Sequence, residues 1–333
     1  MKAGPPVMAL PGVTPALSAR LHDGLARVDE LIRATVDHDD PLIVAASGHL
    51  AEAGGKRLRP LLTLLASELG SGVNDSVVAA AAGVELTHLA SLYHDDVIDE
   101  ARVRRGVPSV NEKYGNTTAI LIGDLLFGKA SELVAGLGPD AVLIQARTFV
   151  RLCSGQIRDD RPCPPGTDPV AYYLEVLSDK TGALIATAAR YGAMFSGGSP
   201  EHVDVMRAYG ERLGMAFQLA DDLIDITSEA SETGKTPGTD LREGVDTLAV
   251  LYARASTDPA DARLRELLEQ DLRDDALHAE ALSLLRTNAA LGHARRETVA
   301  VGRQASALLA PLPDGDAKAA LEALVTSVVD RVG

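Results

Sequence analysis

Apolar residues recur at helical spacing along almost the whole chain, and the alternating pattern of a strand is nearly absent. Clusters of glycine and proline, such as "RPCPPGTDP" and "SGGSP", separate the periodic segments. The pattern therefore predicts an all-α protein. The expected helices span residues 15–36, 41–53, 57–70, 75–100, 117–136, 139–159, 169–177, 180–196, 200–226, 243–255, 259–269, 273–290, 292–309 and 316–331.

Composition agrees with close-packed helices. Of the 333 residues, 46% are hydrophobic but only 3% are aromatic, so alanine, leucine and valine must build the core. No shift in composition marks a linker. We therefore expect residues 1–14 to form a flexible leader and residues 15–333 a single helical domain.

Charge and cysteine content exclude several classes of function. The net charge of −15 argues against a nucleic-acid-binding or anionic-membrane surface, because either needs a basic face. Two cysteines without C-x-x-C spacing indicate neither a zinc site nor a disulfide framework. No window approaches about 18 uninterrupted apolar residues, so no transmembrane segment is expected. A cytoplasmic protein fits these features.

Two stretches, "SLYHDDVIDE" and "FQLADDLIDI", interrupt the apolar pattern with the same D-D-x-x-D spacing. At about 100° per residue, each triplet falls within roughly 100° on one face of its helix. Both lie in last turns, where the helix dipole disfavours negative charge. Bound divalent cations remove this conflict, and all-oxygen ligands favour Mg²⁺. The candidate metal ligands are Asp95, Asp96, Asp99, Asp221, Asp222 and Asp225.

A single D-D-x-x-D motif is equally consistent with a helix cap or a solvated helix face. Two copies in apolar surroundings, both at helix ends and accompanied by basic motifs, favour the metal-binding interpretation.

Basic residues stand where an anion could bind. In "GGKRLRP" the glycines allow close approach of the backbone, while Lys56 and Arg59 lie on one side of a helix start whose N–H groups favour phosphate. "RRG" places Arg104 and Arg105 just beyond the first aspartate triplet, where guanidinium groups can bind phosphate bidentately. Alone, each motif would pass as surface charge.

Three further positions are weaker candidates. His88 lies two turns before Asp95 on the same helix face, although a lone histidine is more often a satisfied, partly buried group. Lys180 opens a helix in "DKTGAL", and Lys235 follows the second triplet. Each lysine by itself would be an ordinary surface charge.

The ordered set of motifs resembles the all-trans isoprenyl (polyprenyl) diphosphate synthase family over nearly the full chain. It comprises "GGKRLRP", "HLASLYHDDVIDEARVRRG", "GDLLF", "GQ", "KTGAL" and "FQLADDLID" followed by "GKTPGTDLREG". The resemblance implies an all-α, single-domain bundle around a central deep cavity, usually a homodimer. It also implies Mg²⁺, about three ions per active site, bridging the diphosphate of an allylic substrate.

The resemblance also implies roles for single residues. Isopentenyl diphosphate would be bound by Lys56, Arg59, His88 and Arg105. The allylic diphosphate side would involve Arg104, Lys180, Thr181, Gln218 and Lys235. Lys180, Thr181 and Gln218 would also be catalytic, since their carbonyl, hydroxyl and amide oxygens can stabilise an allylic cation. Many relatives have G-K-x-T-L-P where this chain has "GVDTLA", so Val245 and Ala249 replace a lysine and a proline.

Residues just before the first triplet bear on product length. A chain that grows away from the metals passes Ala90 and Ser91, which are small, and one helical turn of about 5.4 Å is close to one prenyl unit. This favours a medium-to-long product of about 30 to 50 carbons. Phe127 could instead close the tunnel early, and Ala90 and Ser91 could be small merely for helix packing.

Three alternatives remain open at this point. The chain could be a shorter-chain synthase making a farnesyl or geranylgeranyl product. It could be a class I terpene cyclase, although such enzymes need no isopentenyl diphosphate site and usually carry a different second metal motif. It could also be a non-catalytic synthase subunit, although such subunits tend to lose aspartates or arginines. A transient membrane contact for product release is also compatible with the sequence.

Overall fold

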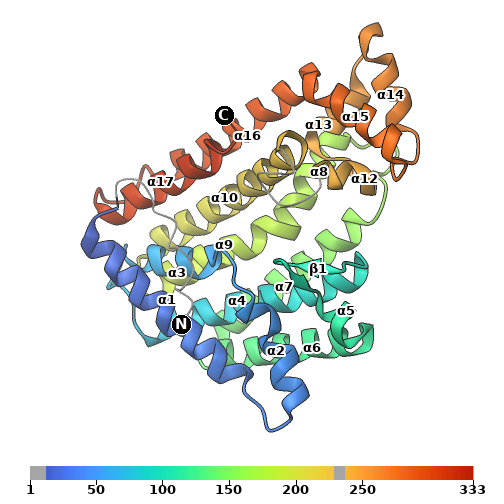
Figure 1. Ribbon diagram of the computed structural model, residues 1–333. Helices are drawn as coiled ribbons and strands as arrows, with labels where there is room; N and C mark the ends of the chain where they lie inside the picture. The colour runs from blue at the N-terminus through green and yellow to red at the C-terminus, as the bar shows by residue number, and fades with distance from the viewer. Residues whose placement is uncertain (1–12, 229–236, 333) are drawn as a thin grey trace. The chain divides into compact units, whose positions relative to one another are not determined.

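The computed structural model describes residues 13–228 and 237–332, and these are almost entirely helical, as the sequence predicts (Figure 1). The earlier helices are α1 (Pro15–Val36), α2 (Pro41–Glu52), α3 (Leu58–Ser67), α4 (Asp75–Ile98), α5 (Val110–Tyr114), α6 (Asn116–Ala135), α7 (Pro139–Asp159), α8 (Pro169–Leu177) and α9 (Ala183–Phe195). The later ones are α10 (Pro200–Thr227), α12 (Thr239–Glu243), α13 (Leu248–Ala255), η2 (Pro259–Asp261), α14 (Ala262–Leu268), α15 (Asp275–Thr287), α16 (Ala289–Leu308) and α17 (Asp316–Val329).

The helix starts follow from capping chemistry. The side chains of Thr14 and Asn74 accept hydrogen bonds from backbone N–H groups in the first turns of α1 and α4. Asp40 and Asp168 do the same for α2 and α8, each directly before a proline that cannot donate a hydrogen bond. Local sequence therefore determines where these helices begin.

The chain divides into two compact units. The first takes in the chain up to Val150 together with Leu184–Gly210 and Leu309–Ala323. The second takes in Arg151–Ala183, Glu211–Leu308 and the residues from Leu324 onward. Helices α7, α9, α10 and α17 contribute residues to both. The single domain expected from composition stays a prediction.

Helix α4 is the centre of the first unit, where it packs against α1, α3 and α6. It is buried on nearly all sides up to Tyr93, which explains its apolar sequence with little periodicity. By length and composition, α4 is the one described helix that could span a membrane. However, 72% of its most apolar window is buried, as in the core helix of a folded protein.

The structure departs from the sequence prediction in four places. A short hairpin, β1 (Val103–Arg104) and β2 (Val107–Pro108), follows α4, and the five-residue helices α5 and α12 were not predicted. Between α8 and α9 the helix does not break but continues through a π-helical turn, η1 (Ser178–Gly182). Short hairpins and wide turns lack a repeating hydrophobic pattern, so periodicity could not reveal them.

Candidate active site

The first aspartate motif ends α4, and its three carboxylates differ in exposure. Asp96 is 0% exposed, whereas Asp95 is half-buried and the side chain of Asp99 is 51% exposed. The Oδ1 atom of Asp96 accepts a hydrogen bond of 2.6 Å from Nε of Arg104. Arg104 also brings Nη2 within 3.8 Å of Asp99. The middle aspartate therefore positions an arginine, while its neighbours remain accessible.

The first motif suits a bound cation. The second oxygen of Asp96, Oδ2, is buried and has no hydrogen-bond partner among the described residues, so its remaining charge favours a cation held by the neighbouring carboxylates. In the part of the chain that the structure describes, no three acidic, histidine or cysteine side chains gather around one point. Mg²⁺ needs only one or two carboxylates when substrate phosphates and water complete its ligands, so the donor set fits this ion.

The "RRG" motif forms the tip of the β1–β2 hairpin. Arg105 and Gly106 both have positive φ, 54° and 77°, as a type I′ turn requires. Nη1 of Arg105 donates to the carbonyl oxygens of Leu50, at 2.8 Å, and Gly54. A Cβ atom on Gly55 would lie 2.9 Å from Cζ of Arg105. The glycines of "GGKRLRP" therefore let this arginine reach the loop.

Two residues that sequence analysis missed hold this loop in place. Arg57 has a φ of 49° at the start of α3, a strained conformation for a residue with a side chain. Its Nη1 donates to Oε1 of Glu85 at 2.8 Å, and its Nε lies 3.2 Å from Oδ1 of Asp29. The signal for Glu85 was an acidic residue within the apolar sequence of α4, one turn before His88.

The first unit brings together three residues predicted to bind isopentenyl diphosphate. Burial lowers the pKa of Arg59 to about 10, although the carboxylate of Glu85 opposes this shift. Burial also holds the pKa of His88 well below its ordinary 6.5, helped by Arg59 and Arg105. Nε of Arg59 is buried and unpartnered within the described ranges. Lys56 is exposed in the adjoining loop. This cationic cluster is suited to an anion.

The second aspartate motif, near the end of α10, has the same burial pattern. Asp222 is 7% exposed and accepts hydrogen bonds from the hydroxyl of Tyr173 and from Nε2 of Gln218, the latter at 2.9 Å. Burial raises the pKa of Asp222 to about 6, against the effect of these two donors. Asp221 accepts from Arg331 at 2.7 Å, and Asp225 accepts from two backbone N–H groups at the start of α12.

The catalytic candidates lie around η1 in the second unit. The hydroxyl of Thr181 donates to Oε1 of Gln218 at 3.4 Å, and Gln218 in turn donates to Asp222. Nζ of Lys180 donates to Oδ2 of Asp159 at 2.6 Å. Sequence analysis missed Asp159, although it lies three residues after the glutamine of the "GQ" motif. These contacts bring Thr181, Gln218 and Asp222 together, whereas Lys235 lies outside the described residues.

In both motifs the middle aspartate points into the protein and the outer two are more accessible. About 100° per residue separates the second carboxylate from the first, which is enough to turn it from the surface to the interior. Asp96 and Asp222 are therefore better suited to support the site than to contact a metal directly. The assignment of all six carboxylates as ligands stays a prediction.

The residues considered for product length all belong to the first unit. Ala90 is 2% exposed and sits in the hydrophobic cluster around α4, whereas Ser91 is half-buried and donates to the carbonyl of His88 at 2.9 Å. Phe127 stacks on Phe149, with ring centroids 3.9 Å apart. Ala90 therefore packs in the core and Ser91 has the more accessible side chain, while the role of either in product length stays a prediction.

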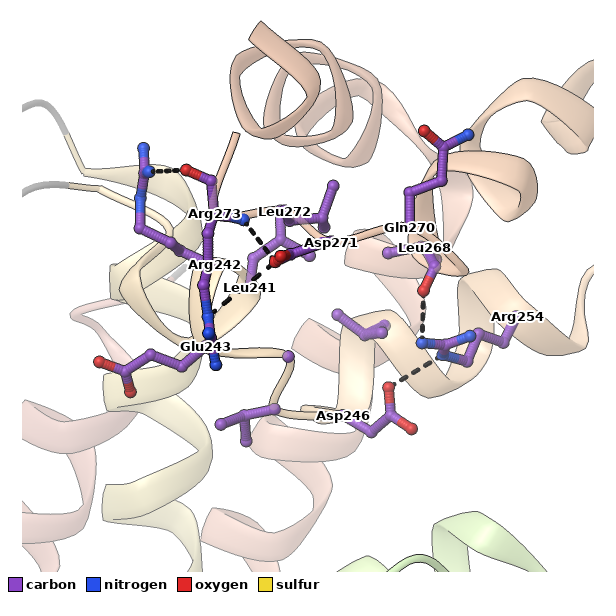
Figure 2. A pocket seen from close by; sticks show the side chains of 13 residues that line it. Leu241, Arg242, Glu243, Asp246, Arg254, Leu268, Gln270, Asp271, Leu272 and Arg273 are labelled. Atoms are coloured by element: carbon purple, nitrogen blue, oxygen red, sulfur yellow. Dashed lines mark hydrogen bonds and ion pairs between the residues drawn. The ribbon is translucent and has the colours of Figure 1, made fainter. Parts of the chain in front are cut away.

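The second unit contains a polar pocket of about 110 Å³ (Figure 2). Arg254 pairs there with Asp246 at 2.9 Å, and Arg242 donates to the carbonyl of Arg273 at 3.0 Å. Ligand pockets usually enclose about 300–1,000 Å³, so this one is too small for a prenyl substrate. Val245, which replaces the expected lysine, lines it and is 39% exposed.

Known proteins resemble this chain over almost its full length. A family model described as polyprenyl synthetase matches residues 40–285. A nonaprenyl diphosphate synthase of Mycobacterium tuberculosis is 47% identical over 317 residues, 95% of this chain and 95% of the relative.

Two crystal structures extend this similarity to the fold. Geranylgeranyl pyrophosphate synthase from Corynebacterium glutamicum, complexed with calcium and isoprenyl diphosphate, matches with a TM-score of 0.87 at 44% identity, covering 96% of this chain and 98% of that one. A decaprenyl diphosphate synthase from Rhodobacter capsulatus matches with a TM-score of 0.85 at 34% identity, covering 96% of this chain and 99% of that one. The expected all-α fold is thereby confirmed.

The depressed pKa of His88 predicts a dependence of stability on pH. Below its ordinary pKa of 6.5 the unfolded chain takes up a proton that the folded protein refuses, so the free energy of unfolding falls as the pH falls. Between neutral pH and about pH 5.5, the free energy of unfolding of His88→Gln should fall by about 1 kcal/mol less than that of the wild type. Urea unfolding measures this difference. His22→Gln, at an exposed position on α1, is the matched control. If His88→Gln parallels the wild type throughout, folding does not lower the pKa of His88.

Proposed function

The chain belongs to the polyprenyl synthetase family, and on this basis we propose that it condenses isopentenyl diphosphate with an allylic diphosphate to give an all-trans polyprenyl diphosphate. The observation that carries the proposal is the combination of two features. One is the partly buried cationic cluster around Arg59 and His88, and the other is a pair of helices that each carry partly exposed carboxylates near their ends. A prenyltransferase needs both an anion site and metal-binding carboxylates.

Mg²⁺ is the proposed metal, with a set of about three ions. Asp95, Asp99 and Asp221 would hold it, while Asp96 and Asp222 keep the helix ends in place through their buried hydrogen bonds. When bound, the metal supplies positive charge that stabilises the departing diphosphate. A structural relative complexed with calcium and isoprenyl diphosphate supports a divalent ion in this role.

The residues of the first unit would bind isopentenyl diphosphate. Arg59 offers a guanidinium whose Nε is buried and has no partner among the described residues, and Arg105 is fixed by two backbone carbonyls. His88 stays neutral among these cations and can donate or accept a hydrogen bond without adding charge. Lys56 lies at the exposed side of the same loop. Fixed cations cost little reorganisation when the anion binds.

The residues of the second unit would act on the allylic partner. Its carbon–oxygen bond breaks and the diphosphate leaves with the electron pair, which produces an allylic cation. Oxygen atoms of Lys180, Thr181 and Gln218 are neutral dipoles that can stabilise this cation without trapping it. The isopentenyl double bond then attacks, and loss of a proton to the released diphosphate restores a double bond. Lys235 remains a candidate contact on the allylic side.

Other functions fit less well. A terpene cyclase needs no second anion site, whereas this chain gathers Arg59, His88 and Arg105 into a cationic cluster suited to one. A non-catalytic subunit would not need both aspartate motifs to keep accessible carboxylates. The replacement of a lysine by Val245 affects one diphosphate contact and not the reaction class.

Removing the metal-binding carboxylates should abolish condensation. Asp95→Asn and Asp221→Asn should each lower kcat by about 100-fold or more with Mg²⁺, labelled isopentenyl diphosphate and a series of allylic primers, because charge on the leaving diphosphate is no longer neutralised. Products are separated by chromatography. Asp204→Asn is the matched control, since this carboxylate lies on the same helix as Asp221 and is 75% exposed.

Two results would count against the proposal. If the wild type condenses no primer, the synthase function is wrong. If the wild type is active and both aspartate variants keep full activity, the reaction stands but the metal assignment falls.

A product of about 30 to 50 carbons is the proposed length, with one helical turn per added prenyl unit. The similarity to a nonaprenyl diphosphate synthase supports it. A shorter, farnesyl- or geranylgeranyl-type product is the alternative, supported by the similarity to geranylgeranyl pyrophosphate synthase.

Bulk at Ser91 should shorten the product, because the half-buried side chain lies one turn before Asp95 on the same face of α4. Ser91→Phe should shift the distribution by several prenyl units, whereas Ser91→Ala should leave it unchanged. Ala90→Phe is a poorer test, since Ala90 is packed in the core and overpacking costs about 1–3 kcal/mol. An unchanged distribution in an active Ser91→Phe enzyme would exclude this position from length control.

A homodimer is the proposed assembly. Exposed apolar side chains occur on both α6 and α7, two helices that meet at the stack of Phe127 on Phe149. They are Ile120, Leu121, Val142, Leu143 and Val150, and we propose that they form the dimer surface. So many exposed apolar residues together are typical of an interface. A cytoplasmic location is proposed as well, with no more than transient membrane contact during product release.

Charge on this dimer surface should separate the two copies. Leu121→Asp combined with Leu143→Asp should convert a dimer to the 34.9 kDa monomer in sedimentation velocity, because a buried, unpaired carboxylate is costly. Leu42→Asp, at an exposed position on α2, is the control and should leave the mass unchanged. A wild type that sediments as a monomer would contradict the assembly.

A further inference from the structure

The wide turn η1 is an unusual place for two catalytic candidates. The N–H group of Ala183 donates to the carbonyl of Ser178, five residues earlier, where an α-helix would use Asp179. A π turn is rare, has poorer hydrogen-bond geometry than an α-helix, and occurs frequently at functional sites. It sits directly at Lys180 and Thr181, so it sets the direction in which both residues point. Something must hold this turn in its wide form.

Arg151 on α7 contacts the turn and the neighbouring helix α10 at once. Its Nε donates to Oδ1 of Asp179 at 2.7 Å. Its Nη2 donates to the carbonyl of Ser178 at 3.3 Å, to the hydroxyl of Ser178 at 3.0 Å and to Oε1 of Glu211 at 2.7 Å. The hydroxyl of Ser178 donates to the same oxygen of Glu211 at 2.6 Å. One guanidinium therefore binds the carbonyl that accepts the π-type hydrogen bond.

Helices α7 and α10 pack directly against the backbone of η1. Movement of side chains alone therefore cannot let this wide turn tighten into an α-helical turn. A Cβ atom on Gly155 would lie 2.6 Å from the backbone nitrogen of Lys180, so α7 touches the turn directly. On the other side, a Cβ atom on Gly182 would lie 3.1 Å from the carbonyl oxygen of Glu211. Both neighbouring helices thus contact the backbone of the turn.

Residues four apart on α7 form a continuous line of contacts with this turn. Arg151 binds Ser178 and Asp179, Gly155 touches Lys180, and Asp159 accepts from Nζ of Lys180. Spacing of four keeps all three on one helix face. Gln218, two turns after Glu211 on α10, accepts a hydrogen bond from the hydroxyl of Thr181. The side chains that hold the turn therefore continue into those that hold the catalytic candidates.

We propose that Arg151 is a positioning residue that fixes the wide turn through Ser178, Asp179 and Glu211, and so aims Lys180 and Thr181 at the carbon–oxygen bond that breaks in the allylic diphosphate. The inference rests on the proposed prenyltransferase function. Arg151 itself touches no substrate in this role. The planar fork of arginine is required, because lysine has a single attachment point and cannot bind three separate groups in fixed directions.

The test compares Arg151→Lys and Arg151→Met with the wild type. Both should lower kcat, by about 100-fold for Arg151→Met, because a displacement of about 1 Å at a reacting group has that effect. The KM for isopentenyl diphosphate should not change, since its residues lie outside this network. Binding of a slowly ionising allylic thiolodiphosphate with Mg²⁺ should also persist. Arg147→Met, at an exposed position one turn earlier on α7, is the matched control.

Two further measurements separate positioning from a general loss of folding. Millimolar guanidinium should restore activity to Arg151→Ala in a saturable way, because the free cation can occupy the partly exposed space between Asp179 and Glu211. Amide hydrogen exchange should rise at residues 178–183 in Arg151→Met and stay unchanged elsewhere. Should the alanine variant not fold, Arg151→Lys carries the test through its fall in kcat.

The outcomes are distinct. If the wild type condenses substrates and the Arg151 variants match it in kcat, the positioning role is wrong while the proposed function stands. A loss shared equally by Arg147→Met, or a rise in the KM for isopentenyl diphosphate of the same size as the fall in kcat, also overturns it. If the wild type forms no product, the proposed function fails and the role of Arg151 fails with it.

Discussion

Two helices must each end in three carboxylates, and the rest of the candidate site depends on how the protein tolerates this. Like charges at a helix C-terminus repel one another and the dipole. In both motifs the middle carboxylate is buried and hydrogen-bonded, which leaves the outer ones accessible. The partners of the two buried carboxylates differ. Asp96 accepts a hydrogen bond from the cationic side chain of Arg104, whereas Asp222 accepts from the neutral side chains of Tyr173 and Gln218. The neutral donors leave the negative charge of Asp222 uncompensated. Burial therefore raises the pKa of Asp222 to about 6.

In the first unit the repulsion is between positive charges, because several arginines gather there although the chain has a net charge of −15. Buried cations require a fixed counter-charge, and Glu85 supplies it from within the largely buried helix α4. The strained conformation of Arg57 is held by that carboxylate, so the loop that carries Lys56 is anchored to the core. The long-range field of this acidic protein repels anions, and only a preassembled local cluster can bind one. Neutral His88 completes the cluster without adding repulsion.

Several glycines in the sequence motifs have a role in packing and not in chemistry. Gly55 makes room for the guanidinium of Arg105, and Gly155 brings α7 against the backbone of Lys180. In each case a charged residue from a distant part of the chain is placed by the absence of a side chain. The glycines of the motifs therefore determine how closely neighbouring elements approach, while other motif residues supply the reactive groups.

Much of the site was predictable from the sequence, and the limits have a physical cause. Helical class, the position of most helices, and the placement of both aspartate motifs at helix ends follow from local periodicity and capping, which are properties of neighbouring residues. The hairpin at Arg105 and the wide turn at Lys180 were missed, because each departs from the regular repeat by one or two residues. Asp222 accepts a hydrogen bond from the hydroxyl of Tyr173, 49 residues away in the sequence, and Asp221 accepts one from Arg331, 110 residues away. The sequence by itself determined which groups are available. Only the tertiary structure decided which of them are buried, paired or left to bind, because burial depends on partners from distant segments.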